Sequence, residues 1–227
     1  MSEVSVSGIN SISGLGRAYF RLRYTILFYS LLLTMVAAPA SGALEIEAGL
    51  LELFLAANLL IAVIPVGREK SRRVLLVVLT ILGAARLVTT WLNHPALAVI
   101  ILGMWTIIGL IAAAVALKFA FGARSVDLEH VYAALSAYLL VGIFFGVFYW
   151  VLEQFWPGTF TFTGNFSRVS AIYFSFVTLA TLGFGDIVPR TDVARGLAIV
   201  EGVGGQLFLA VLIARLVSIY GRGKETN

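Results

Sequence analysis

The stretch Thr181-Leu182-Gly183-Phe184-Gly185-Asp186 lies between two long apolar segments of the chain. Its two glycines stand at alternate positions, and glycine adopts backbone angles with φ of either sign at little steric cost. A backbone of this kind can turn successive carbonyl groups to one side, where their oxygens replace the water around a dehydrated cation. We therefore expect a cation site built from the carbonyls of Thr181, Leu182, Gly183 and Phe184, together with the hydroxyl of Thr181.

The composition restricts the class of protein. The chain has 227 residues, of which 60% are hydrophobic and 12% charged, and its mean hydropathy is +0.98. A soluble domain with so little charge would expose large apolar patches, so we expect a polytopic membrane protein. The chain has no cysteine, and His94 and His130 fall at opposite ends of predicted spans. We therefore expect no thiolate metal site and no redox cofactor. The sequence shows no nucleophile with a base, no glycine-rich phosphate loop with lysine and no metal cluster, so we also expect no enzymatic activity.

Apolar runs predict the membrane-spanning helices, each of which needs about 20 residues. The runs end at recognisable helix stops that contain proline, glycine or asparagine. The prediction is an all-α membrane protein with six transmembrane helices over residues 24–43, 48–66, 74–92, 96–121, 131–155 and 193–220.

The distribution of lysine and arginine predicts the orientation. Basic residues precede the first span and follow the second, fourth and sixth, whereas the other loops carry Glu45, Glu47, Asn93 and His94. By the positive-inside rule both termini are cytoplasmic. This placement explains the net charge of +4 without a nucleic-acid partner. It also puts residues 181–186 on the outer side of the membrane.

The segment from Arg168 to Ala180 directly precedes the glycine-containing stretch and is too short to span a bilayer. It contains neither glycine nor proline, so we expect a re-entrant half-helix covered by protein or by a water-filled cavity. The C-terminal end of a helix carries a partial negative charge. That end would therefore favour a cation beside Thr181.

The pattern Thr178-x-x-Thr181-x-Gly-Phe-Gly-Asp186 resembles the pore of tetrameric potassium channels, whose filter reads Thr-Val-Gly-Tyr-Gly with conservative variants. The resemblance is specific over residues 131–220 and only architectural over 20–121. It implies a homotetramer around one axis, with K⁺ as the permeant ion at Thr181, Leu182, Gly183 and Phe184. Thr178 and Gly185 would support the filter. Asp186 would concentrate cations at the outer mouth or make a structural hydrogen bond to the half-helix.

Leu182 and Phe184 depart from the commonest Val and Tyr of the family. Phenylalanine lacks the phenolic O–H, so one hydrogen bond behind the filter is missing, but we expect selectivity to survive. We expect both side chains to face away from the axis and to pack against the aromatic residues Tyr173, Phe174 and Phe176.

The last predicted span contains an acid and several glycines. Glu201 lies inside the span, where acids are functional or paired, and is expected to support the filter from behind. Gly205 falls on the position of the flexible glycine in the inner helix of bacterial potassium channels, but it could equally serve close helix packing. Gln206, Leu209 and Ile213 are spaced to line an inner cavity. Asp192 is a candidate N-cap of this helix.

The first four spans differ from a voltage sensor. The fourth span has no basic residue between positions 96 and 117, so the membrane potential has no gating charge to move. Glu52 and Arg86 lie at similar depth in the second and third spans and predict a buried ion pair. A site for a lipid headgroup or small ligand is the alternative. The link over residues 124–130 is a candidate lever between these spans and the pore.

These observations predict a cytoplasmic tail over 1–23, a four-helix peripheral domain over 24–121, a linker helix over 122–130, a pore domain over 131–220 and a cytoplasmic tail over 221–227. The predicted function is passive, potassium-selective and largely voltage-independent conduction across a plasma membrane, which the resemblance to bacterial channels implies is a bacterial inner membrane. The alternatives are a poorly selective monovalent cation channel on the same scaffold and a non-conducting regulatory membrane subunit. Membrane lipids are the other expected partners.

Overall fold

The computed structural model describes residues 22–37, 39, 49–63, 69–91, 94–122 and 127–224. Residues 1–21 of the predicted N-terminal tail, residues 225–227 at the C-terminus and residues 123–126 of the predicted linker lie outside this part of the chain. So do the acidic loop residues Glu45 and Glu47.

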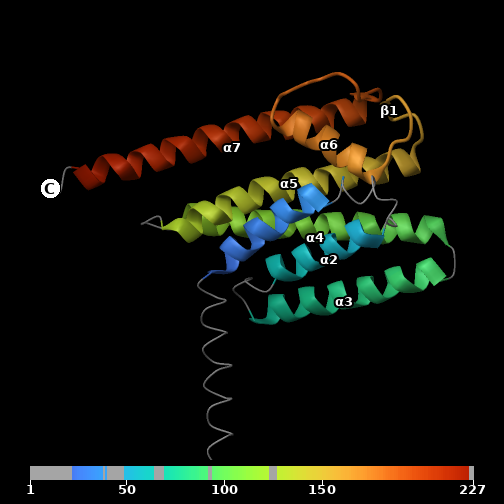
Figure 1. Ribbon diagram of the computed structural model, residues 1–227, viewed down its shortest axis with the longest axis horizontal. Coiled ribbons are helices and arrows are strands. Elements are labelled where there is room, and N and C mark those ends of the chain that lie inside the picture. Colours follow the sequence, from blue (N-terminus) through green and yellow to red (C-terminus); the bar gives the residue numbers. More distant parts are fainter. Residues whose placement is uncertain are drawn as a thin grey trace, which may run out of the picture.

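The described residues are almost entirely helical. The helix over Leu22–Ala37 is followed by α2 (Gly49–Val63), α3 (Glu69–Trp91), α4 (Pro95–Gly122), α5 (Leu128–Phe155), α6 (Arg168–Leu179) and α7 (Asp192–Lys224). Figure 1 shows the long helices stacked side by side, with α3 on one side and α7 on the other. The short α6 lies between α5 and α7 at one end of the stack.

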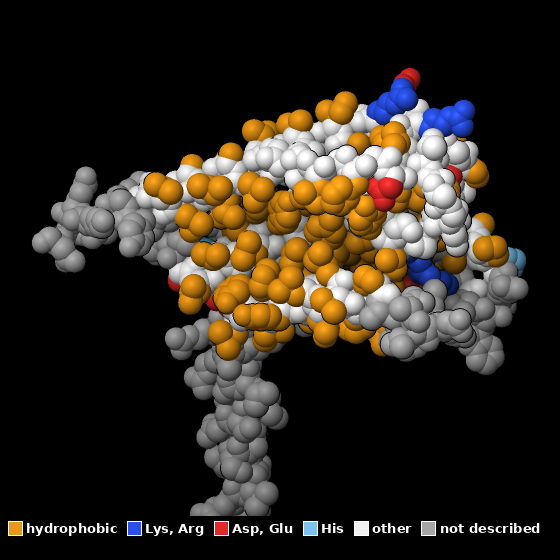
Figure 2. Space-filling model, turned by 45° about the horizontal axis from the view of Figure 1, so that its top comes forward, with side chains coloured by type: hydrophobic (Ala, Val, Ile, Leu, Met, Phe, Trp, Pro, Cys, Tyr) orange, Lys and Arg blue, Asp and Glu red, His pale blue; other side chains and the backbone are white. Residues whose placement is uncertain are grey.

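Three helices are long and apolar enough to cross a bilayer. They are Pro95–Gly122, Leu128–Phe155 and the Asp192–Ser218 part of α7. Among the other described helices, Leu22–Ala37 and Leu51–Val63 are apolar but shorter than a full span, and α3 has 23 residues. Figure 2 shows hydrophobic side chains over most of the visible face of the helices. An apolar outer surface of this kind suits a lipid environment.

The α4 and α5 helices form the centre of the molecule because small residues let them approach closely. A Cβ atom at Gly109 of α4 would overlap the ring of Phe144 of α5. Ala112, Ala113 and Ala116 continue this buried face of α4 toward its C-terminal end. Small residues at a helix interface bring two backbones into contact within a membrane. The peripheral helices are thereby fastened to the first helix of the predicted pore domain.

The α6 helix is fixed on α5 in the same way. Cβ atoms at Gly142 and Gly146 would overlap Phe176 and Ile172 respectively. A second, mainly aromatic cluster lies beside this contact and includes Tyr149, Phe160, Phe166 and Phe174. The position of α6 relative to α5 is therefore fixed by packing on both sides.

A two-stranded antiparallel ladder is a small departure from the predicted all-helical fold. Strand β1 (Phe160–Thr161) precedes α6 and pairs with β2 (Val188–Pro189), which follows the glycine-containing stretch. The Thr159 carbonyl extends the contact by accepting a hydrogen bond from the Arg190 amide at 2.8 Å. The ladder therefore closes the loop that contains α6 and residues 181–186.

The N-cap predicted for the last helix is wrong by one residue. The Thr191 hydroxyl accepts a hydrogen bond from the Ala194 amide at 3.4 Å, and Asp192 is the first helical residue. An acid in the first turn still interacts favourably with the positive end of the helix dipole.

Candidate functional site

Capping at both ends defines α6. The Ser167 side chain accepts a hydrogen bond from the Ser170 amide at 3.1 Å. At the other end the chain leaves the helix with the amides of Thr181 and Leu182 donating to the carbonyls of Thr178 and Val177, at 3.0 and 2.8 Å. The stretch that begins at Thr181 is therefore anchored directly to the C-terminal turn of α6.

The backbone of residues 181–186 alternates in conformation. Thr181, Gly183 and Gly185 have φ angles of 56°, 61° and 79°. This left-handed region costs roughly 1–2 kcal/mol for a residue other than glycine. A Cβ atom at Gly183 or Gly185 would meet no atom within 4 Å. Glycine is therefore needed at these two positions for its backbone freedom and not for space.

Thr181 occupies this region although it is β-branched, and it is the one such non-glycine residue in the described part of the chain. Its hydroxyl accepts a hydrogen bond from the side-chain amide of Gln206 in α7, at 3.2 Å. Strained backbone at a non-glycine residue persists where the surroundings determine it. Here the surroundings are the end of α6 and Gln206.

In this monomer the side chains of Leu182 and Phe184 are 58% and 65% exposed. Of the three predicted aromatic neighbours, Tyr173 stacks on Phe184, with ring centroids 6.3 Å apart. The rings of Phe174 and Phe176 instead pack on α5, against Tyr149 and Gly142. The predicted packing of Phe184 against Tyr173 is confirmed, and the packing of Leu182 and Phe184 against Phe174 and Phe176 stays a prediction.

Asp186 at the end of the stretch interacts with α6. Tyr173 of α6 lies near it, and both residues line the same pocket. The Tyr173 ring also stacks on Phe184. The two roles predicted for Asp186, at the outer mouth and as a hydrogen-bond partner of the half-helix, stay predictions.

Glu201 of α7 is 2% exposed and lies directly behind α6. The Tyr149 hydroxyl of α5 donates to Glu201 Oε2 at 2.7 Å, and the Ser175 hydroxyl of α6 contacts Glu201 Oε1. Ser175 also contacts the Gly142 carbonyl at 2.7 Å. One carboxylate therefore joins three helices behind the stretch, through partners that the sequence did not identify.

The glycines of α7 differ in what surrounds them. A Cβ atom at Gly205 would overlap the Leu179 carbonyl oxygen and come within 2.9 Å of Leu179 Cδ1, whereas one at Gly204 would meet no atom within 4 Å. Gly205 is thus a close-contact residue between α7 and the end of α6. Of the predicted cavity residues farther along α7, Leu209 is half-buried and Ile213 is exposed in this monomer.

The acid and the base predicted to pair in the peripheral helices are in contact. Arg86 Nη2 of α3 lies 2.7 Å from Glu52 Oε1 of α2. The same carboxylate oxygen also accepts a hydrogen bond from Arg168, the first residue of α6. The guanidinium of Arg168 lies 5.4 Å from the centroid of the Trp150 ring. The sequence missed Arg168, which extends the pair into a link between the peripheral helices and α6.

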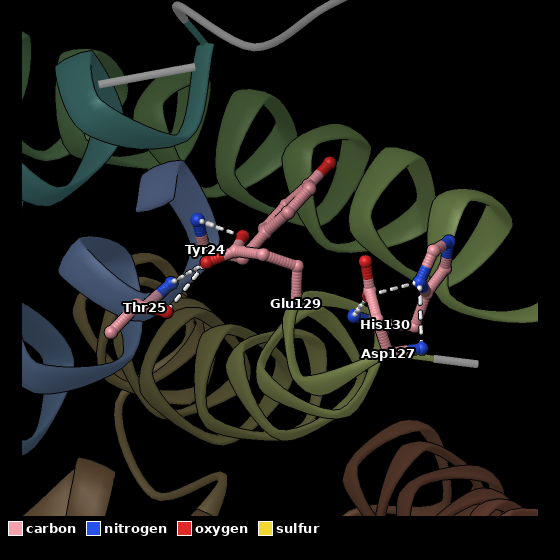
Figure 3. Close-up of polar contacts among 5 residues, drawn as sticks. All are labelled: Tyr24, Thr25, Asp127, Glu129 and His130. Carbon is pink, nitrogen blue, oxygen red and sulfur yellow. Dashed lines mark hydrogen bonds and ion pairs between the residues drawn. The ribbon is translucent and has the colours of Figure 1, made fainter. Parts of the chain in front are cut away.

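A second link lies at the opposite end of α5, where Leu128 begins the helix (Figure 3). Glu129 accepts hydrogen bonds from the amides of Tyr24 and Thr25 and from the Thr25 hydroxyl, at 3.0, 3.4 and 2.5 Å. It thereby provides acceptors for amides in the first turn of the Leu22–Ala37 helix.

Beside it, Asp127 is the N-cap of α5, and its side chain accepts a hydrogen bond from the His130 amide at 3.1 Å. The side-chain hydrogen bond from His130 lowers the pKa of Asp127 below its usual value. Residues 128–130, which the sequence assigned to a linker helix, are therefore the first turn of α5.

Comparison with known proteins identifies the region that contains this site. A protein-family model described as "Ion channel" matches residues 136–222. The chain is 42% identical over 80 residues to two-pore potassium channel 4 of Arabidopsis thaliana, a match that covers 35% of this chain and 27% of that protein. It is 36% identical over 91 residues to two pore potassium channel c of Oryza sativa subsp. japonica, covering 39% and 18%.

Residues 136–222 are therefore similar to ion channels, and the two relatives that match this region are described as potassium channels. The chain spans about a quarter or less of the length of these two relatives. No solved structure matches it. The family region begins within α5 and contains α6, residues 181–186 and nearly all of α7.

Proposed function

We propose that this protein is a potassium-selective channel, in which Thr181, Leu182, Gly183 and Phe184 form the ion-binding filter. The observation that carries the proposal is the alternating positive φ at Thr181, Gly183 and Gly185, directly after a half-helix whose C-terminal end adjoins them. Successive carbonyls can then face one axis and replace the hydration shell of K⁺. The named relatives are potassium channels by description, which supports the same ion.

The assembly that fits this proposal is a homotetramer. The chain carries one such stretch, and one stretch supplies one wall of a pore. Leu182, Phe184 and much of the apolar face of α7 are exposed in the monomer. Four copies around an axis would cover these surfaces and bring four filter segments together.

In the proposed channel the chain crosses a plasma membrane six times, α6 is re-entrant and both termini are cytoplasmic. The three helices that are long and apolar enough to span a bilayer support this topology. K⁺ is then the transported ion and no cofactor is required.

Conduction should depend little on voltage. The α4 helix has no lysine or arginine before Lys118, close to its C-terminal end. A helix without basic residues in the membrane field gains almost nothing from a change in potential.

Potassium and sodium flux into liposomes that contain the purified chain tests the function. We expect uptake of K⁺ and Rb⁺ to exceed uptake of Na⁺ and Li⁺. Gly183→Ala should abolish the preference, because alanine disfavours the φ of 61° at this position. Gly122→Ala is a matched control, since a Cβ atom there meets no atom within 4 Å and α4 lies outside the filter.

Two other outcomes correspond to the alternative functions. Equal flux of K⁺ and Na⁺ would indicate a poorly selective cation channel. Absence of flux from a correctly assembled protein would indicate a non-conducting regulatory subunit.

A further inference from the structure

An open cavity of about 340 Å³ lies where α3, α4, α5 and α6 meet. One side of the cavity is apolar and the other is polar. The apolar side is formed by four residues of α4, Pro95, Ala98, Val99 and Leu102. The polar side consists of Arg86, Thr89, His94, Gln154 and Arg168, beside the ring of Trp150.

The charged groups of this cavity are of one sign. Arg86 and Arg168 both line it, and no carboxylate is among its described lining residues. Glu52 reaches the two guanidiniums from α2 and contacts both through one oxygen, Oε1. The three side chains together carry one net positive charge, and each is less than one-fifth exposed. A phosphate that entered this site would be attracted by the net positive charge more strongly than in bulk water, because the screening by solvent is weaker there.

The arginines are held in place before any ligand arrives. Arg168 is fixed by Glu52 and by the Trp150 ring, and Arg86 by Glu52 and by a 3.4 Å hydrogen bond to the Thr89 hydroxyl. A guanidinium has five N–H donors in a planar fork, so it can contact Glu52 and a second anion at once. Positioned donors lower the entropic cost of binding.

The helix ends and the apolar wall of the cavity indicate what kind of molecule would carry the anionic group. The α4 and α6 helices both begin at the cavity, and the positive ends of their dipoles add to the attraction for an anion. Leu102 lies seven residues beyond Pro95, about 10 Å farther along α4. A molecule with an anionic group at the arginines could therefore extend an apolar chain along this wall.

We propose that this cavity binds a phosphate group, supplied by the headgroup of a membrane phospholipid or by free phosphate. The site lies beside the first turn of α6, so its ligand would contact the residue that begins the predicted pore helix. The proposal concerns binding alone and does not depend on whether the protein conducts ions.

Two substitutions of the same ion-pair cluster separate binding from structural support. Arg168→Gln removes a donor, and dioleoyl phosphatidylglycerol should bind about tenfold more weakly, as expected for one charge-assisted hydrogen bond. Glu52→Gln removes the carboxylate that competes for both guanidiniums, and the same lipid should bind several-fold more tightly. Both substitutions break the same contact and should lower thermal stability. Their opposite effects on binding are therefore specific to a phosphate site.

Native mass spectrometry of the full chain in detergent, titrated with dioleoyl phosphatidylglycerol, gives the affinities. Arg195→Gln is the control, because Arg195 is an exposed base at the start of α7 and does not line the cavity. A parallel arm adds millimolar inorganic phosphate, measured as competition with the lipid and by thermal shift without it.

The outcomes assign the source of the phosphate or reject the site. If the lipid binds more weakly to Arg168→Gln and more tightly to Glu52→Gln than to the wild type, the site binds a lipid headgroup. If the lipid does not bind, but inorganic phosphate stabilises Arg168→Gln less and Glu52→Gln more than the wild type, the site binds free phosphate. Equal weakening by Arg168→Gln and Arg195→Gln, weaker binding in Glu52→Gln, or no binding of either probe would overturn the proposal.

Discussion

Replacing Gly205 with alanine should weaken the packing of α7 on α6, although alanine is the better helix former. The new Cβ atom would overlap the Leu179 carbonyl oxygen and come within 2.9 Å of Leu179 Cδ1. The carbonyl belongs to the last turn of α6, immediately before residues 181–186. Relief of the overlap must therefore move α7 or the end of the helix that anchors the filter.

Gly204→Ala provides the matched comparison. A Cβ atom at Gly204 meets no atom within 4 Å, so this variant gains the helix propensity of alanine, about 1 kcal/mol, without overlap. Gly205→Ala has the same gain but adds the cost of overpacking, about 1–3 kcal/mol. The difference in stability between the two variants should therefore be about 1–3 kcal/mol in favour of Gly204→Ala.

The assay is thermal unfolding of both variants in the same detergent, combined with single-channel recording. Close packing predicts a lower unfolding midpoint and a disturbed filter for Gly205→Ala. A hinge at Gly205 instead predicts a stable protein with reduced open probability and unchanged selectivity. Equal stability of the two variants would refute the packing argument.

Three further results are expected. Glu201→Gln should destabilise the protein by about 1–3 kcal/mol, because it disturbs the buried acceptor of Tyr149 and Ser175; unchanged thermal unfolding would contradict this. Hydrogen bonding to His130 lowers the pKa of Asp127 in the folded protein. The ionised Asp127 carboxylate therefore stabilises the fold above the ordinary aspartate pKa of about 4, and this stabilisation is lost as the pH falls below that value. Thermal unfolding between pH 3 and 7 should therefore show a smaller acid-side loss for Asp127→Asn than for the wild type, and equal losses would count against it. Open probability should vary only shallowly with voltage, and a gating charge of several elementary charges would show that α4 is misinterpreted.

The features that the sequence predicted well are local. The glycines at 183 and 185 indicate positive φ on their own, and the segment before them is apolar, unbroken and too short to span. These properties depend on neighbouring residues alone. Positive φ at Thr181 could not be predicted in this way, because it is imposed by the end of α6 and by Gln206 from α7.

The features that the sequence missed depend on contacts between distant residues. Glu201 was recognisable as a buried acid, but its partners Tyr149 and Ser175 lie 52 and 26 positions away. Arg168 was visible as a charge at the start of the short helix, yet its contact with Glu52 spans 116 positions. The β1–β2 ladder has two residues in each strand, too few to produce an alternating pattern.

The central claim is that residues 181–184 form a filter selective for K⁺, and the reversal potential of the reconstituted wild-type protein tests it most directly. With K⁺ on one side of a planar bilayer and Na⁺ at the same concentration on the other, the account predicts a reversal potential far from zero, with the sign that opposes flow of K⁺ from its own side. A reversal potential near zero, from a protein that conducts and is correctly assembled, would contradict it.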